Sequence, residues 1–157
     1  SAASDVYKRQ DNNESNMFVT LIVGILDLET GILKLCNAGH NPPILIYPDG
    51  QVSYLEFKTQ IFVGVVEDFK YSDEEVVLEK ESKLFLYTDG VTEAENINKE
   101  LYGEEKLLEM LSDNASSDVR TTVNVVVDSI ASHVKEAEAS DDLTILLIQY
   151  EPGTANS

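Results

Sequence analysis

The sequence predicts an α+β fold, with strands in the first part of the chain and two helices before a closing strand. Apolar runs rich in β-branched residues, separated by turn signals, follow one another from residue 17 to residue 89. From residue 103 to residue 137 the apolar residues recur at the three-four spacing of helices. The stretch "DLTILLIQY" (142–150) then has the composition of a strand. Strands followed by helices favour α+β over an alternating βαβ arrangement.

Each of the three expected hairpins consists of two strand-like runs with a short turn signal between them. The pairs are 17–28 with 32–38 around "ETG", 44–47 with 51–57 around "PDG", and 71–80 with 83–89 around "ES". The segment "GHNPP" (39–43) is expected to be an irregular loop, because its prolines lack an N–H donor and fix the backbone angle φ.

Two later segments are expected to be helical. In "GEEKLLEMLSDN" (103–114) the leucines share one face, and acids occupy the first turn, where the helix dipole favours them. In "SSDVRTTVNVVVDSIASHVKEA" (116–137) valines recur at helical spacing, although β-branched side chains weaken helix formation. Ser116 or Ser117 is the expected N-cap of the second helix.

Composition limits the classes of partner. The chain has 157 residues and 43% hydrophobic content, which suits one packed domain or part of one. With 29 acidic and 11 basic residues its net charge is −18, which argues against binding to nucleic acid or to an anionic membrane surface. No apolar run approaches the roughly 20 residues of a membrane span. These features predict a cytoplasmic protein. The negative charge has two interpretations, a soluble cytosol-type surface or a set of acidic residues some of which bind cations.

The single cysteine, Cys36, excludes an internal disulfide framework. Because it lies in the apolar run "ILKLCNA", it is expected to be a small buried hydrophobic residue rather than a reactive thiol.

The first ten residues, "SAASDVYKRQ", show no periodicity. Residues 5–10 resemble the translated end of a transposon that is used to prepare sequencing libraries. We therefore treat residues 1–10 as a non-native leader and exclude them from the fold. The expected organisation is a partial domain over residues 11–152 and a tail over residues 153–157.

Carboxylates stand at the ends of two predicted strands. Asp89 ends one strand, and Asp141 and Asp142 begin another. If these strand ends are neighbours in one sheet, the carboxylates repel each other unless a cation lies between them. Mg²⁺ and Mn²⁺ prefer such oxygen ligands, and Gly90 would let the backbone turn sharply beside the ion. The alternative is that Asp89-Gly90 is only a turn and Asp141-Asp142 only the start of a strand.

Three motifs resemble those of the SpoIIE/RsbU-type serine phosphatases, the bacterial branch of the metal-dependent PP2C-like (PPM) phosphatases. They are "NAGHNPPIL" (37–45), "LFLYTDGVTEAEN" (84–96) and "SDDLTILLI" (140–148), in the order and spacing of that family. The resemblance extends from about Met17 to Tyr150. It implies a PP2C-like antiparallel β-sandwich flanked by helices, with a two-metal Mn²⁺ or Mg²⁺ centre at one edge.

The resemblance also assigns roles to residues. It implies that Asp89 and Asp141 are metal ligands, whereas Asp142 occupies a position that is Asn in wider relatives and forms hydrogen bonds. No side chain is the nucleophile, because a metal-bound water attacks the phosphorus of a phosphoserine or phosphothreonine protein. In relatives that substrate is often an anti-anti-sigma-type protein. His40 has two readings, a structural role in its loop and a role in positioning phosphate, and His133 is expected to be merely partly exposed.

The amino-terminal portion of the family's domain is missing, since nothing in residues 11–36 matches its further aspartate motifs. We therefore expect a fragment that is inactive alone and exposes sheet edges and apolar faces. A haloacid-dehalogenase-type phosphatase is disfavoured because Tyr87 occupies the position of that family's nucleophilic aspartate. The remaining alternative is a non-catalytic binding or regulatory module on a phosphatase-like fold.

Overall fold

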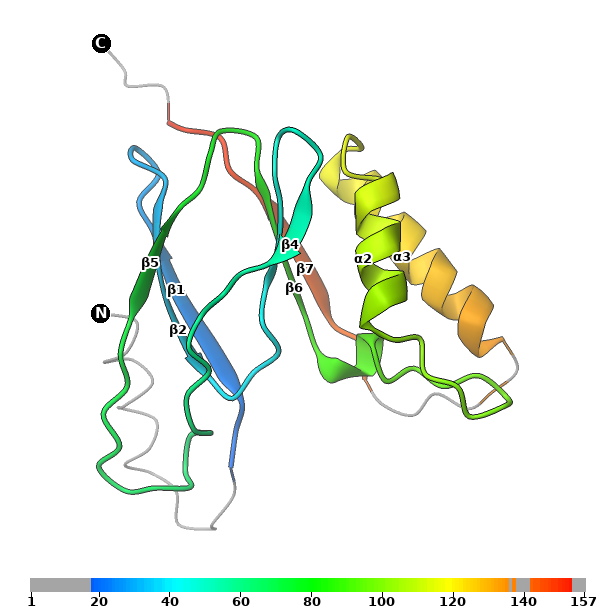
Figure 1. Ribbon diagram of the computed structural model, residues 1–157, viewed down its shortest axis with the longest axis horizontal. Helices are drawn as coiled ribbons and strands as arrows, with labels where there is room; N and C mark the ends of the chain where they lie inside the picture. The colour runs from blue at the N-terminus through cyan, green and yellow to red at the C-terminus, as the bar shows by residue number, and fades with distance from the viewer. Residues whose placement is uncertain (1–17, 136, 138–141, 154–157) are drawn as a thin grey trace. The chain divides into compact units, whose positions relative to one another are not determined.

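The computed structural model describes residues 18–135, 137 and 142–153 of the chain (Figure 1). These residues form two compact units. The first unit comprises the chain up to Pro42, Glu56–Lys80 and the residues from Glu151 onward. The second unit comprises Pro43–Leu55 and Glu81–Tyr150. Among the described residues, no helix has the length and apolar character needed to cross a membrane.

The first unit contains a three-stranded antiparallel sheet in the order β1-β2-β5. Its strands are β1 (Leu21–Leu26), β2 (Ile32–Ala38) and β5 (Glu74–Val77). The predicted hairpin over 17–38 is confirmed, with Leu26 opposite Leu33 beside the turn. Asp27 closes that turn, because its carboxylate accepts the N–H groups of Glu29 and Thr30 at 2.9 and 3.0 Å. These backbone hydrogen bonds lower the pKa of Asp27.

A small core in the first unit surrounds Cys36, which is fully buried with Ala38 and Val63. Tyr71 and residues of β1 pack against this cluster. Burial raises the pKa of the Cys36 thiol, which disfavours the reactive thiolate. The predicted role of Cys36 as a small buried hydrophobic residue is confirmed.

The second unit holds a four-stranded antiparallel sheet in the order β4-β3-β6-β7, with two helices beside it in Figure 1. Its strands are β3 (Ile44–Ile46), β4 (Val52–Tyr54), β6 (Lys83–Tyr87) and β7 (Ile145–Gln149). The helices are α2 (Glu104–Asp113) and α3 (Val119–Val134), and the short 3₁₀ helix η1 covers Asp89–Val91. The predicted second hairpin, both helices and the closing strand are therefore confirmed.

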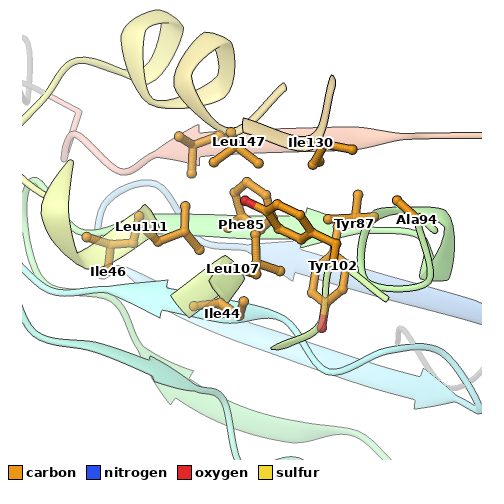
Figure 2. Close-up of a cluster of buried hydrophobic side chains, with 12 residues drawn as sticks. Ile44, Ile46, Phe85, Tyr87, Ala94, Tyr102, Leu107, Leu111, Ile130 and Leu147 are labelled. Carbon is orange, nitrogen blue, oxygen red and sulfur yellow. The ribbon is translucent and has the colours of Figure 1, made fainter. Parts of the chain in front are cut away.

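The core of the second unit lies between its sheet and the apolar faces of α2 and α3 (Figure 2). Alternate residues of β6, Phe85 and Tyr87, contribute their rings from the sheet, and Leu107 and Leu111 of α2 are fully buried against them. Burying one such side chain contributes about 1.5–3 kcal/mol. The apolar faces of the helices and of the sheet therefore pack in one core, which holds one face of β6 in place.

The predicted third hairpin is wrong, because β5 and β6 belong to different sheets. β5 pairs with β2, whereas β6 pairs with β3 and β7. The switch occurs over a few residues: Leu78 N–H still donates to Gly31 O at 2.8 Å, and Glu81 N–H already donates to Tyr150 O at 2.9 Å. Glu81 has a positive φ of 70°, which turns the chain here without closing a two-stranded ladder.

The expected serine N-cap of α3 is also wrong. Asp118 is the N-cap residue, and its carboxylate accepts the N–H of Thr121 at 3.0 Å and the hydroxyl of Thr121 at 2.6 Å. A carboxylate accepts two donors at once and complements the helix dipole, which favours Asp118 over the preceding serines.

Candidate metal centre

Asp89 lies two residues after the end of β6, a central strand of the four-stranded sheet in the second unit. β6 is hydrogen-bonded on both sides, to β3 and to β7, and four of its five residues are buried. Its last paired residue is Tyr87, which lies opposite Ile145. The backbone that leads to Asp89 is therefore held rigidly, and Asp89 lies at the margin of the sheet, as the sequence predicts.

Main-chain bonds then fix the start of η1. The carbonyl oxygen of Asp89 accepts the N–H of Glu93 at 2.8 Å and the hydroxyl of Thr92 at 3.3 Å. The Asp89 carboxylate is exposed, and its Oδ1 accepts the N–H of Gly90 at 3.0 Å. An exposed carboxylate on a fixed backbone can offer oxygen to a hard cation at little reorganisation cost.

The chain turns at Gly90, as expected, and the approach of its backbone to a metal ion stays a prediction. Gly90 lies inside the right-handed η1 helix, is buried, and does not have the positive φ that only glycine adopts readily. Its observed contribution is the N–H that orients the Asp89 carboxylate.

The second predicted ligand, Asp141, lies outside the described residues, so its distance from Asp89 stays a prediction. The segment that follows it is described and lies beside β6. Thr88, the residue before Asp89, donates its N–H to Thr144 O at 3.1 Å, and its hydroxyl donates to Asp142 O at 3.2 Å. The structure thus brings residues 142–144 to the strand end that carries Asp89.

The donor type suits Mg²⁺ or Mn²⁺, since Asp89 offers a hard carboxylate oxygen. The number of donors is incomplete: within the described part of the chain, no group of three or more His, Cys, Asp or Glu side chains is arranged to hold a metal ion. Asp89 therefore fits one position in a metal shell that needs further ligands.

An acidic cleft of about 800 Å³ lies next to η1, at the start of α2. Its lining includes Glu93, Glu104, Glu105 and Glu109, with Lys106 as its basic residue. So many carboxylates disfavour an anion that approaches without a cation. The charge of this surface therefore disfavours binding of a free anion.

His40 supports its own loop. Asn37, which is 1% exposed, accepts the His40 N–H at 2.8 Å and donates to the His40 carbonyl at 2.9 Å. The His40 ring nitrogen Nδ1 lies 3.2 Å from Asn41 O. These contacts favour the structural reading of the "GHNPP" loop.

His133 is partly exposed, as predicted, but it also has a specific partner. Its Nε2 lies 2.9 Å from the carbonyl oxygen of Glu100, and its ring packs edge-on against Tyr102 at 5.6 Å between centroids. It therefore fastens the loop after η1 to the end of α3. Sequence reasoning missed this contact, and also missed the Thr88 hydroxyl, because both join residues far apart in the chain.

Comparison with protein families gives a match over nearly the whole chain. The family model described as stage II sporulation protein E (SpoIIE) matches residues 2–151. Protein IcfG of Synechocystis sp. is 28% identical over 142 residues, which cover 90% of this chain and 22% of that protein. Phosphoserine phosphatase RsbP of Bacillus subtilis is 28% identical over 143 residues, which cover 90% of this chain and 33% of that protein.

Solved structures show the same fold. The SiaA-PP2C domain of Pseudomonas aeruginosa matches with a TM-score of 0.81 at 20% identity, over 95% of this chain and 61% of that one. The manganese-presoaked phosphatase domain of the cell fate determinant SpoIIE from Bacillus subtilis matches with a TM-score of 0.68 at 14% identity, over 97% of this chain and 66% of that one. The antiparallel sheets and two helices are therefore PP2C-like, and the chain spans only part of each relative's length.

Proposed function

The chain belongs to the SpoIIE family, and from that premise we propose that it is the carboxy-terminal part of a metal-dependent protein serine/threonine phosphatase. The observation that carries the proposal is the placement of Asp89. Its exposed carboxylate stands on a fixed backbone at the end of β6, beside the segment that leads from Asp141 into β7. Asp89 and Asp141 are the proposed metal ligands.

The proposed cofactor is Mn²⁺ or Mg²⁺, which when bound would activate water and neutralise charge on the phosphoryl oxygens. Asp89 holds one ligand oxygen at a fixed position, and the N–H of Gly90 orients its carboxylate. The acidic cleft beside η1 repels a phosphate group that lacks a metal partner. The negative charge of this cleft is consistent with the proposed cation, which would offset repulsion of the phosphate.

We propose that residues 11–152 alone do not complete the centre. The described residues supply no three-ligand group, and the match to RsbP covers 33% of that protein. A divalent ion held by two aspartates keeps most of its water and binds weakly. A non-catalytic binding module is the corresponding alternative for the chain by itself.

The proposed substrate is a protein that carries phosphoserine or phosphothreonine. The matching relative RsbP is named a phosphoserine phosphatase, and its family suggests a cytoplasmic anti-anti-sigma-type substrate and a role in sigma-factor regulation. A net charge of −18 is consistent with a protein partner rather than a nucleic acid.

The test compares this chain with a version extended upstream to a whole domain. Both are assayed for Mn²⁺-dependent release of phosphate from a phosphoserine protein, and Mn²⁺ binding is measured by calorimetry. We expect turnover only from the extended protein and its loss in Asp89→Asn. Asp113→Asn is the matched control, since it removes an exposed carboxylate from the end of α2.

Two results would contradict the proposal. An extended protein that binds Mn²⁺ but has no phosphatase activity would favour the binding-module alternative. Robust turnover by the 157-residue chain, abolished in Asp89→Asn, would show that its own residues complete the centre.

A further inference from the structure

The side chain of Thr88 joins two strand ends that lie 54 or more residues apart in the chain. Its hydroxyl donates to the carbonyl oxygen of Asp142 at 3.2 Å and accepts the N–H of Thr144 at 3.1 Å. Its main-chain N–H donates to Thr144 O at 3.1 Å. One residue thus makes three hydrogen bonds to the segment that enters β7.

These bonds begin where the regular ladder stops. The last pair between β6 and β7 is Tyr87 with Ile145. Beyond it the chain from β6 turns into η1, so its main chain no longer runs alongside the other strand. The Thr88 main-chain N–H extends the attachment to Thr144, and its hydroxyl extends it to Asp142, which directly follows the proposed ligand Asp141.

The attachment matters because the two ends carry like charges. Asp89 follows Thr88, and Asp141 precedes Asp142, so ionised carboxylates at both positions would push the strand ends apart before a cation binds. A neutral hydroxyl that donates to one residue and accepts from another resists this separation without adding charge. Residues 142–144 would then stay beside the strand end that carries Asp89 in the absence of metal.

We propose that Thr88 is a positioning residue of the metal centre, whose hydroxyl holds residues 142–144 against the strand end that carries Asp89. This inference rests on the proposed function. Only a side chain with a hydroxyl on Cβ reproduces both bonds from this site, so serine should substitute and valine, which has the same shape, should not.

The test uses the variants Thr88→Val and Thr88→Ser in the complete chain and in the version extended upstream. Amide hydrogen exchange at Thr144 is measured by NMR without metal, and Mn²⁺ affinity is measured by calorimetry. Thr30→Val is the matched control, because the Thr30 hydroxyl also accepts a backbone N–H, that of Ile32 at 3.4 Å, in the first unit. Circular dichroism establishes that each variant is folded.

In Thr88→Val we expect the Thr144 amide to exchange about tenfold faster, which corresponds to one lost hydrogen bond. Mn²⁺ affinity of the extended protein should fall by about 10- to 100-fold, the usual effect of losing a group that orients a ligand. Thr88→Ser and Thr30→Val should retain both properties.

Each failure has a distinct signature. If the unmodified extended protein binds no Mn²⁺, the proposed function fails, and the inference about Thr88 fails with it. If that protein binds Mn²⁺ and Thr88→Val binds it equally well, only the positioning role is overturned. Equal loss of affinity in Thr88→Ser and Thr88→Val would also overturn it, because the hydroxyl would then not be the group that matters.

Discussion

The ring of Phe62 lies so close to Gly39 that no other residue fits at position 39 without movement. A Cβ atom added to Gly39 would lie 2.0 Å from Cδ1 and 2.6 Å from Cε1 of Phe62. Gly39 also has a positive φ of 74°, which L-residues adopt with strain. This contact packs the start of the "GHNPP" loop against the ring of Phe62, a residue that is 40% exposed.

Gly39→Ala should therefore lower the free energy of unfolding by about 2–3 kcal/mol, through backbone strain together with displacement of the ring. Chemical denaturation followed by circular dichroism measures this change. Gly50→Ala is the matched control, because Gly50 has a φ of 90° but its nearest atom is Ala115 Cβ at 4.0 Å. Gly50→Ala should lower the free energy of unfolding only through backbone strain, by about 1 kcal/mol.

The clash can be separated from the strain with Phe62→Leu. In that background Gly39→Ala should cost about as much as Gly50→Ala does. An unchanged cost in both backgrounds would show that the ring moves away freely and that backbone strain accounts for the whole effect.

Lys83 places a charged group inside the second unit. It is 6% exposed, and its Nζ donates to Ala115 O at 2.7 Å and to Ser117 O at 2.5 Å, in the connection between α2 and α3. Lys83→Met should lower the free energy of unfolding by about 2 kcal/mol, because it leaves two inward-facing carbonyl groups without their donor. Thermal unfolding monitors the loss. An unchanged stability would mean that water replaces the ammonium group.

Lys83 should also make the free energy of unfolding depend on pH. Loss of hydration lowers its pKa below 10.5, and the negative charge of Asp118 partly opposes this shift. Between the folded pKa and 10.5 the unfolded chain binds more protons, so this residue makes stability rise with pH in that window. Tyr102, whose pKa burial raises above 10.0, acts in the opposite direction at higher pH. The difference between the curves of the parent and Lys83→Met isolates the lysine contribution.

The sequence predicted elements better than it predicted which elements pair. Strand alternation and helical periodicity located β1 to β4, both helices and β7. They could do so because an element that buries one face repeats its apolar residues at its own period along the sequence. The assumed pairing of β5 with β6 failed because their turn residues do not encode a partner. β6 is apolar on nearly all positions and pairs on both sides, whereas β5 alternates and pairs with β2.

The candidate site was predictable to a similar extent. Asp89 could be placed at a strand end because an apolar run leads directly into it. The Thr88 hydroxyl could not be identified, because its partners are more than 50 residues away and no local pattern links them. Asp118 was missed in favour of two neighbouring serines because all three residue types can cap a helix, and geometry alone selects among them.

Asp118 should make stability depend on pH at the acid end. Its hydrogen bonds from Thr121 lower its pKa below 3.8 in the folded state. The carboxylate therefore stabilises the fold above 3.8, and this contribution is lost as the pH falls through the folded value. Asp118→Asn keeps an oxygen that caps the helix but cannot titrate. Thermal unfolding of Asp118→Asn should consequently change less between neutral and acidic pH than that of the parent. Parallel curves would contradict this assignment.

An exposed apolar face on β7 should drive self-association. Leu146 and Ile148 are 54% and 41% exposed, whereas Leu147 between them is 7% exposed and belongs to the core. In the described part of the chain β7 pairs on one side only, with β6. This combination of a free edge and apolar side chains matches the exposed surface that the sequence predicts, and it is a template for pairing with another copy.

The double variant Leu146→Lys/Ile148→Lys should shift sedimentation velocity profiles toward the monomer at high concentration, because charged side chains on an edge strand oppose pairing. Its free energy of unfolding should change by no more than about 0.5 kcal/mol per site, as is usual for exposed positions. Ile97→Lys is the matched control, since Ile97 is 71% exposed in the loop after η1 and lies on no strand. Association that persists in the double variant but disappears in Ile97→Lys would assign the contact to that loop instead of β7.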